Sequence, residues 1–155
     1  MSLPVGAPLA GTVQPLAAVP DAVFAGQLVG AGAAVQPPGG AGLLDVLAPV
    51  AGRLVKLHPH AFILLSASGT GVLVHVGIDT VTLDGAGFTA RATEGDEVAA
   101  GQRVVTFDPA EVRGRGLSAV CPVVVLDSAP DSVCPDHPGA EVRPGELLYT
   151  WPGTG

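Results

Sequence analysis

Residues 62–76 read FILLSASGTGVLVHV, and this stretch indicates the architecture of the chain most directly. Two apolar runs, 62–66 and 72–76, flank a Ser-Ala-Ser-Gly segment that suits a tight turn, so we expect an antiparallel hairpin. Successive side chains of a strand point to opposite faces of a sheet. The valines of the second run therefore face a core, whereas Leu73 and His75 face away from it.

This hairpin brings two histidines together in one of two registers. With a turn centred between Ala67 and Ser68, His60 lies directly opposite His75. Opposite residues share a face, with Cβ atoms about 4.5–5.5 Å apart. A turn centred on Thr70 would instead separate the two histidines. The alternation along the second run favours the first register, which places two imidazoles side by side on an open face of the sheet.

The rest of the chain has the composition of an all-β protein. Its 155 residues include 22 Gly and 15 Pro, yet 48% of them are hydrophobic, which excludes a disordered linker. Gly and Pro interrupt helices, so we expect an antiparallel β-sandwich or barrel with one core. A chain of this length fits a single domain, 1–155, with its core at about 7–151. One or two short surface helices are expected, the clearer at 109–113 with Asp108 as N-cap and Gly114 as its stop. Further strands are expected at 12–16, 27–35, 53–57, 103–107, 120–126 and 146–151.

Two segments of the chain are repeated, which predicts an internal duplication. Residues 7–11 read APLAG, and residues 48–52 read APVAG. Residues 95–101 read GDEVAAG, and residues 139–145 read GAEVRPG. Each member of a pair is followed by an apolar strand, so drift in a Gly-rich and Ala-rich sequence explains the matches less well than duplication does.

Charge and cysteine content exclude several classes of function. The formal net charge is −7 and the pI is about 4.7, so the surface repels the phosphates of nucleic acids. Lys56 is the one lysine, and no apolar stretch is long enough for a membrane helix, so we expect no membrane insertion. Cys121 and Cys134 are too few for a disulfide framework. The first residues lack the pattern of a secretory signal peptide, so we expect none. We therefore expect a soluble, cytoplasmic protein.

The histidine pair is compatible with two kinds of chemistry. With a third ligand, for which the sequence offers His58 or Asp79, two imidazoles would hold zinc. His58 and His60 would share a face of the strand only if Pro59 keeps that segment extended. Without a metal, one neutral imidazole would act as a nucleophile while its neighbour donates hydrogen bonds to the group being transferred. Two surface histidines without a function are an equally valid interpretation of the pair alone.

The motif around His75 resembles a known family. Residues 74–81 read VHVGIDTV, residues 60–62 read HAF, and residues 19–25 read VPDAVFA. Together with the APVAG segment and the glycines that follow, these motifs occur in order over roughly residues 7–151. In this respect the chain resembles the glucose-type IIA component of the bacterial phosphoenolpyruvate-dependent sugar phosphotransferase system. Members of that family are all-β sandwiches that carry a phosphoryl group.

The resemblance implies a role for each residue of the motif. His75 would take a phosphoryl group from the phosphohistidine of HPr and pass it to a cysteine of a IIB domain. His60 would donate a hydrogen bond to the phosphoryl oxygens, and Gly77, Asp79 and Thr80 would support the site. No cofactor is implied and no metal is required, although His60 and His75 could bind zinc together with a carboxylate of a partner.

The resemblance also implies a docking surface for the two partners. Phe24, Val29, Leu73 and Val81 would form an exposed apolar collar, with ordinary core packing as the alternative for Phe24 and Val29. Asp21 would join Asp79 in meeting basic residues of HPr, unless it simply caps a helix or turn. Regulatory targets would be further partners of this surface.

Four observations show departures from the family pattern or test other interpretations. His58-Pro59 replaces the Thr-Asn that the best-known members place before the first histidine, on a loop two residues longer. Only Met1 to Gly6 precede the first expected strand, so we expect no amphipathic membrane anchor. A biotinyl or lipoyl carrier would need a lysine at a hairpin tip, and Lys56 is expected within a strand. A zinc hydrolase of a related fold would use a His-x-His motif, which here only His58-Pro59-His60 resembles.

Overall fold

The computed structural model describes residues 2–40, 42–133, 135 and 137–153, and the regular secondary structure of these residues is mostly antiparallel β-sheet. The only α-helices within these ranges are two short ones, as expected, so the expectation of an all-β protein is confirmed. The strands are β1 (Leu3–Gly6), β2 (Gly11–Pro15), β3 (Gly30–Gln36), β4 (Leu44–Leu47), β5 (Gly52–His58), β6 (Ala61–Leu65), β7 (Gly71–His75), β8 (Phe88–Ala90), β9 (Glu97–Val98), β10 (Arg103–Phe107), β11 (Cys121–Leu126), β12 (Glu141–Val142) and β13 (Leu147–Trp151). The helices are α1 (Ala22–Ala25) and α2 (Pro109–Gly114), with the 3-10 turns η1 (Leu16–Ala18) and η2 (Thr80–Leu83).

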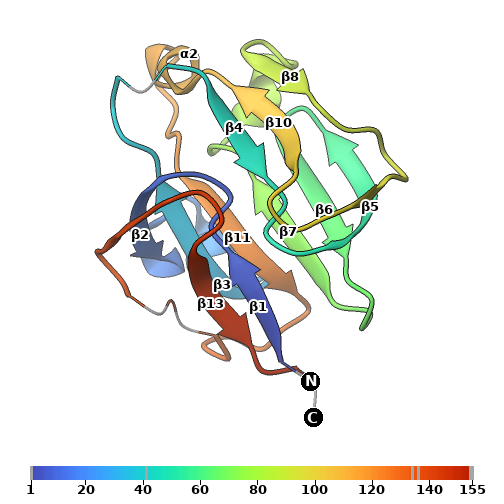
Figure 1. Cartoon of the computed structure of the whole chain (residues 1–155). Coiled ribbons are helices and arrows are strands. Elements are labelled where there is room, and N and C mark those ends of the chain that lie inside the picture. Colours follow the sequence, from blue (N-terminus) through green and yellow to red (C-terminus); the bar gives the residue numbers. More distant parts are fainter. Residues whose placement is uncertain (1, 41, 134, 136, 154–155) are drawn as a thin grey trace.

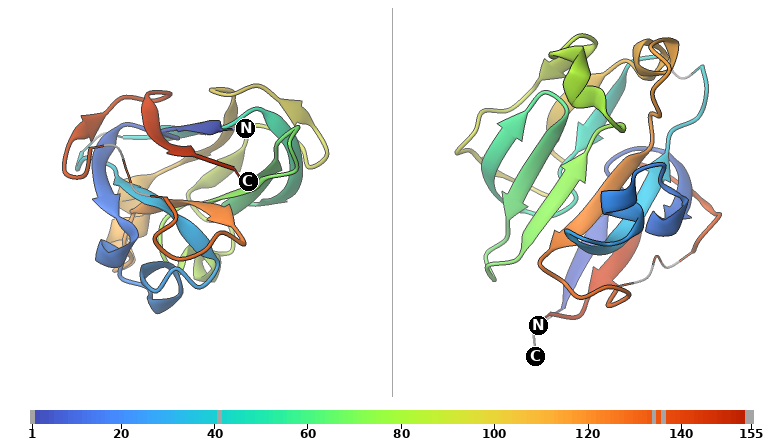
Figure 2. Two further views of the ribbon diagram at one scale, coloured as in Figure 1. Left: turned by 90° about the horizontal axis from the view of Figure 1, so that it is seen from below. Right: turned by 180° about the vertical axis from the view of Figure 1, so that it is seen from behind.

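The strands form two layers. A curled sheet of eight strands, in the order β12-β2-β3-β11-β7-β6-β5-β9, makes the larger layer. The pair β1-β13 and the three strands β4-β10-β8 lie across it, in front in Figure 1. Seen along the layers in Figure 2, the large sheet wraps around the two small ones. This arrangement is the expected sandwich.

The main core lies between these layers and consists largely of valine. β-Branched side chains pack well on a pleated surface, and the sequence supplies them at alternate positions of the central strands. Tyr149 on β13 is fully buried here, and its hydroxyl donates a hydrogen bond of 2.9 Å to the Val123 carbonyl of β11. That bond connects the small sheet to the centre of the large one. The fully buried valines of this core include Val5, Val35, Val46, Val72, Val74, Val76, Val104, Val105, Val112 and Val123.

A second, smaller cluster shows that the expectation of one core was incomplete. It lies on the outer face of the large sheet, under α1 and η1, and its buried members are Leu16, Val19, Phe24, Ala34, Ile78, Val120 and Val124. Figure 2, right, shows α1 lying over β3 and β11 on this face. A sheet that is apolar on both faces needs cover on both, and here the short helix provides it.

Matched hydrogen bonds confirm the internal duplication. The repeated segments 7–11 and 48–52 form equivalent corners, and the repeats at 95–101 and 139–145 form equivalent turns beside them. One copy of the duplicated unit contains residues 7–11 and 139–145, and the other contains residues 48–52 and 95–101. The backbone hydrogen bonds that these segments and their neighbours form in one copy have counterparts in the other. The pairs are Gly6 N to Pro49 O with Leu47 N to Pro8 O, Ala7 N to Glu146 O with Ala48 N to Gln102 O, Gly145 N to Ala7 O with Gly101 N to Ala48 O, Val13 N to Ala140 O with Leu54 N to Asp96 O, and Gly139 N to Val13 O with Gly95 N to Leu54 O. All ten are between 2.7 and 2.9 Å long.

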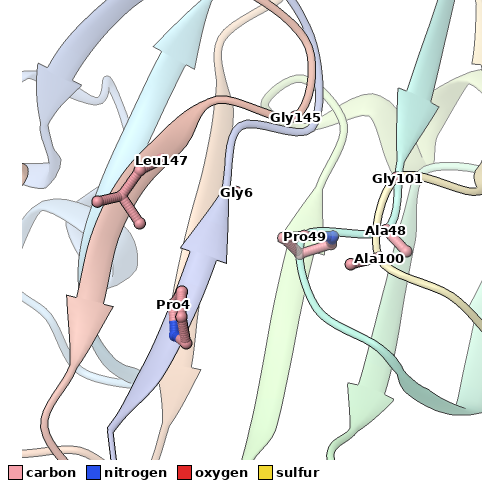
Figure 3. Close-up of a pocket in the computed structure, with 8 residues that line it drawn as sticks. All are labelled: Pro4, Gly6, Ala48, Pro49, Ala100, Gly101, Gly145 and Leu147. Carbon is pink, nitrogen blue, oxygen red and sulfur yellow. The ribbon is translucent and has the colours of Figure 1, made fainter.

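A hollow of about 310 Å³ lies where the two copies meet, on the side of the small sheets. Figure 3 shows that Pro4, Gly6 and Leu147 come from one copy, and Ala48, Pro49 and Gly101 from the other. Its lining has no ionisable side chain, so it offers no group for acid, base or nucleophilic chemistry.

The ends of the elements differ from expectation in a few places. β1 begins at Leu3 and pairs with β13, so the stretch expected to precede the first strand is itself a strand. Asp108 caps α2 as expected, accepting a hydrogen bond from the Ala110 amide at 3.0 Å. The helix runs on through Gly114, however, and the left-handed residue that follows it is Gly116, with φ of 79°. None of the helices in the described ranges combines the length and apolarity needed to cross a membrane.

Candidate functional site

His75 is the last residue of β7, near the middle of the large sheet. Its neighbours along the strand, Val74 and Val76, are fully buried in the main core. Because side chains alternate along a strand, His75 points to the outer face, where it is partly buried. The expected orientation of this strand is therefore confirmed.

His60 lies beside His75, but the register of the strands differs from the one expected. β6 pairs Ala61 with His75, so the hairpin is centred on Ser68 and the predicted direct pairing of His60 with His75 is wrong by one residue. The turn is longer than expected because the Ser66 amide donates to the Thr70 carbonyl, at 2.9 Å. His60 lies instead in the turn between β5 and β6.

The two imidazoles are nevertheless adjacent. The His60 carbonyl accepts a hydrogen bond of 2.7 Å from the Val76 amide, which fixes the turn against the end of β7. The ring centroids of His60 and His75 are 5.3 Å apart, with the ring planes at 67°. Backbone pairing therefore brings together the two side chains that the sequence singled out, although not across a single rung of the sheet.

The loop after β7 sets the orientation of the His75 ring. His75 Nδ1 lies 2.5 Å from the Gly77 carbonyl oxygen. A carbonyl only accepts, so Nδ1 carries the proton and donates, and Nε2 keeps a free electron pair. Gly77 has a φ of 76°, and a Cβ at this position would lie 2.6 Å from Cγ2 of Thr80. The buried Thr80 hydroxyl in turn donates to the Val76 carbonyl at 2.7 Å.

Burial keeps the His75 ring neutral. Desolvation lowers the pKa of His75 below its ordinary value, and this effect exceeds the opposing ones of the Gly77 carbonyl and of the Asp21 and Asp79 carboxylates. The pKa of His60 is lowered too, first by burial and then by the neighbouring charges of His75 and His58. At neutral pH the site therefore presents a neutral imidazole with an available Nε2 beside a second neutral imidazole.

α1 supports the His75 ring from the side. The Asp21 carboxylate caps this helix by accepting hydrogen bonds from the Val23 amide at 2.8 Å and the Phe24 amide at 3.3 Å. Phe24 meets His75 edge to face, with ring centroids 5.2 Å apart. Phe24 is only 7% exposed, so the expectation that it belongs to an exposed collar is wrong. Its ring is part of the second cluster, because α1 folds back onto the sheet.

The exposed apolar surface around the site differs in membership from the expected collar. Val81 is 57% exposed, as expected, whereas Val29 and Leu73 are half-buried against the second cluster. Leu28 is 74% exposed and Val23 is 43% exposed, and sequence reasoning missed both. Their only signal was their position in a segment rich in Gly and Ala, where a large apolar side chain has little core to enter.

Other residues singled out from the sequence take no part in this site. Burial raises the pKa of the Cys121 thiol to about 12, so this cysteine is not a nucleophile at neutral pH. Cys134 lies outside the described residues. Lys56 is confirmed within β5 rather than at a hairpin tip. Across the described ranges, no cluster of three or more His, Cys, Asp or Glu side chains is arranged to hold a metal ion.

Comparisons with known proteins agree with this geometry. A family model described as "phosphoenolpyruvate-dependent sugar phosphotransferase system, EIIA 1" matches residues 3–130. The chain is 39% identical over 124 residues to the PTS system glucose-specific EIIA components of Bacillus cereus and Bacillus anthracis, with 79% of the chain and 73% of each relative covered. It is 38% identical over the same length and shares to that of Oceanobacillus iheyensis.

A solved structure extends the likeness to nearly the whole chain. Glucose permease IIA from Mycoplasma capricolum superposes with a TM-score of 0.85 at 34% identity, covering 97% of this chain and 96% of that one. Sequence family and fold therefore agree over the elements that build the histidine site. The chain belongs to the EIIA 1 family of the phosphoenolpyruvate-dependent sugar phosphotransferase system, and its function is that of a phosphocarrier in that system.

Proposed function

We propose that the phosphoryl group is carried on Nε2 of His75. The observation that carries this proposal is the hydrogen bond from His75 Nδ1 to the Gly77 carbonyl, at 2.5 Å. It holds the proton on one ring nitrogen and leaves the electron pair of the other free. Burial, by lowering the pKa of His75, keeps that electron pair unprotonated at neutral pH.

Transfer then needs no proton to move at His75. The Nε2 electron pair attacks phosphorus, the nitrogen–phosphorus bond of a donor phosphohistidine breaks, and the donor ring recovers its electron pair. His75 keeps the Nδ1 proton throughout, hydrogen-bonded to Gly77. In the second transfer a thiolate attacks phosphorus, and His75 leaves as a neutral imidazole. Such steps depend mainly on positioning and on stabilisation of the phosphoryl charge.

His60 supplies that stabilisation in this proposal. Its ring lies 5.3 Å from that of His75, centroid to centroid, and its neutral form has one N–H to donate. A donor already in place beside the incoming phosphoryl oxygens costs no reorganisation when the charge arrives. His60 is therefore the helper, and His75 the residue that forms the covalent bond.

The partners in this proposal are HPr as donor and a cysteine of a IIB domain as acceptor. The surface beside His75 combines exposed apolar side chains, Val23, Leu28 and Val81, with the carboxylates of Asp21 and Asp79. A surface with both exposed apolar and acidic side chains suits partners that carry apolar and basic ones, and it favours fast association that weakens with salt. Phosphoenolpyruvate is a cytoplasmic metabolite, so the proposal places the chain in the cytoplasm.

Intact mass of the protein after incubation with phosphoenolpyruvate, enzyme I and HPr tests this function. We expect the native chain to gain one acid-labile phosphoryl group, His75→Gln to gain none, and His60→Gln to accept the group but transfer it slowly to a IIB domain. A competent IIA protein in the same mixture is the control. Absence of the mass gain in the native chain, with the control phosphorylated, would refute the assignment of His75.

A further inference from the structure

A third imidazole lies beside the pair. His58, the last residue of β5, stacks on His60, with ring centroids 5.7 Å apart and ring planes at 22°. His60 in turn meets His75 edge to face at 5.3 Å. The three rings therefore form a row, with His60 between a stacked neighbour and the residue proposed to carry the phosphoryl group.

The backbone fixes the spacing of the first two rings. His58 pairs with Ala61, so Pro59 and His60 form a two-residue turn between β5 and β6. Proline fixes φ of the first turn residue, and Gly85 lies against its ring, since a Cβ on Gly85 would be 3.5 Å from Pro59 Cγ. His58 and His60 thus share a side because they flank and occupy a tight turn, whereas the sequence analysis allowed this only for an extended segment.

The His60 ring has little else to hold it. Within the described part of the chain, its nitrogens form no hydrogen bond, in contrast to His75 Nδ1, which is bonded to Gly77. The rings on either side are the aromatic contacts that orient it. The ring of His60 must present one N–H to a phosphoryl oxygen. Phosphoryl transfer is slower when this ring is free to turn, because the N–H then has to be ordered during the reaction.

We propose that His58 is a positioning residue for phosphoryl transfer: by stacking on His60 it holds that ring in the orientation in which its N–H meets a phosphoryl group on His75. His58 itself touches no reacting atom. The inference rests on the proposed roles of His75 and His60, and it adds a residue on which their cooperation depends.

His58 also affects the charge of His60, and this provides an independent measurement. The charged and titratable groups that act on His60 are His75 and His58, each of which lowers its pKa, after burial. The carboxylates of Asp21 and Asp79 raise the pKa of His75 and affect the pKa of His60 only through His75. Replacing His58 with an uncharged ring removes one repulsive charge, so the pKa of His60 should rise while the stack is preserved.

Two variants separate stacking from charge, and one serves as a control. His58→Ala removes the ring, His58→Phe keeps a ring without charge, and His137→Ala removes an exposed histidine remote from the site. The rates of phosphoryl transfer from phospho-HPr to each variant and from each phosphorylated variant to a IIB cysteine would be measured in single turnovers. The imidazole nitrogens of His60 would be titrated by NMR in the same proteins.

We expect His58→Ala to slow transfer about tenfold, as for a misplaced but intact catalytic group, and His58→Phe to restore most of that loss. His137→Ala should match the native protein. In His58→Phe the titration of His60 should move to higher pH. A thermal melt of each variant shows that the turn remains folded.

Two results would overturn the inference. One is a His58→Ala variant that transfers within about twofold of the native rate in both directions. The other is a slow His58→Ala that His58→Phe fails to rescue, because the ring would then not be the cause. Failure of the proposed function is distinguishable, since the native protein itself would then gain no phosphoryl group on His75.

Discussion

Replacement of Gly77 by alanine tests the link between backbone conformation and the reactive ring. Gly77 has a φ of 76°, and its carbonyl oxygen accepts the hydrogen bond from His75 Nδ1. An added Cβ would lie 2.6 Å from Thr80 Cγ2 and 3.0 Å from the Ser118 carbonyl oxygen. Either the loop or Thr80 must shift, and a shift of the loop moves the carbonyl that orients the ring.

Gly69 provides a matched control for the cost in stability. Its φ is 86°, but a Cβ there would have no atom within 4 Å, so Gly69→Ala has the backbone strain without the steric clash. A left-handed conformation costs an alanine about 1–2 kcal/mol, and overpacking a buried site adds about 1–3 kcal/mol. We therefore expect Gly69→Ala to lose about 1–2 kcal/mol and Gly77→Ala about 2–5 kcal/mol.

Thermal melts and phosphoryl transfer measure the two consequences separately. For a chain of 155 residues, each kcal/mol lowers Tm by about 2–4 °C, so Tm of Gly77→Ala should be at least about 2 °C below that of Gly69→Ala. Transfer to His75 should fall about tenfold or more in Gly77→Ala, because the ring loses its fixed tautomer and direction. Transfer should be unchanged in Gly69→Ala.

Either of two results would refute this reasoning. Equal Tm values for the two variants would show that the contact with Thr80 is easily relieved. A native rate of transfer in Gly77→Ala, with NMR showing the Nδ1 proton still on His75, would show that the position of the carbonyl at Gly77 does not control the reaction.

Three further predictions concern the surroundings of the site. Because burial lowers the pKa of His75, the unfolded chain binds its proton more tightly than the native one; the stability that the neutral ring contributes is complete above about pH 6.5 and is lost as the pH falls below it. Urea titrations at several pH values should show this loss, and it should be smaller in His75→Gln. Asp21→Ala removes the hydrogen bonds that cap α1 and should cost about 0.5–2 kcal/mol; it also removes a carboxylate that raises the pKa of His75, so NMR should show that pKa falling further. Tyr149→Phe leaves the Val123 carbonyl without its hydroxyl donor and should cost about 1 kcal/mol in chemical unfolding, with transfer unaffected.

Each of these has an outcome that contradicts it. A loss of stability on acidification that is the same in His75→Gln would assign the effect to other groups. An unchanged His75 titration in Asp21→Ala would show that this carboxylate is screened by solvent. Slower phosphoryl transfer in Tyr149→Phe would mean that the hydrogen bond between the two layers also affects the geometry of the histidine site.

Short strands were the part of the fold that the sequence did not reveal. β9 and β12 have two residues each, too few for alternation to be visible, and β1 lies in a segment with one buried valine, Val5. These strands exist because distant partners complete them, as when Val5 pairs with Tyr149 of β13. The strands of five or more residues, in contrast, were predicted within a few residues of their bounds, and β7, with Val72 and Val74 buried in the core, shows the alternation most clearly.

Of the residues that build the site, sequence reasoning identified those that are close together in the sequence and missed a contact from a distant segment. The motif from His75 to Thr80 is local, and the ring, the glycine with positive φ and the supporting hydroxyl follow one another within six residues, so sequence reasoning identified them. Phe24 is distant in sequence. Nothing near it indicated that α1 folds back and places its ring 5.2 Å from that of His75.

The sequence by itself determined the longer strands, the duplication, and the face of β7 on which His75 lies, because these depend on the period of two in a strand and on the conformational limits of Gly and Pro. Only the tertiary structure decided that His58, His60 and His75 form a row. The position of His58 relative to His60 depends on the two-residue turn between β5 and β6. The position of His60 relative to His75 depends on where the β6–β7 hairpin is centred, and the Ser66–Thr70 hydrogen bond in its turn sets this. A change of one residue in register alters every cross-strand neighbour while leaving the local pattern of apolar and polar residues almost the same, which is why contacts between strands have to be seen in three dimensions.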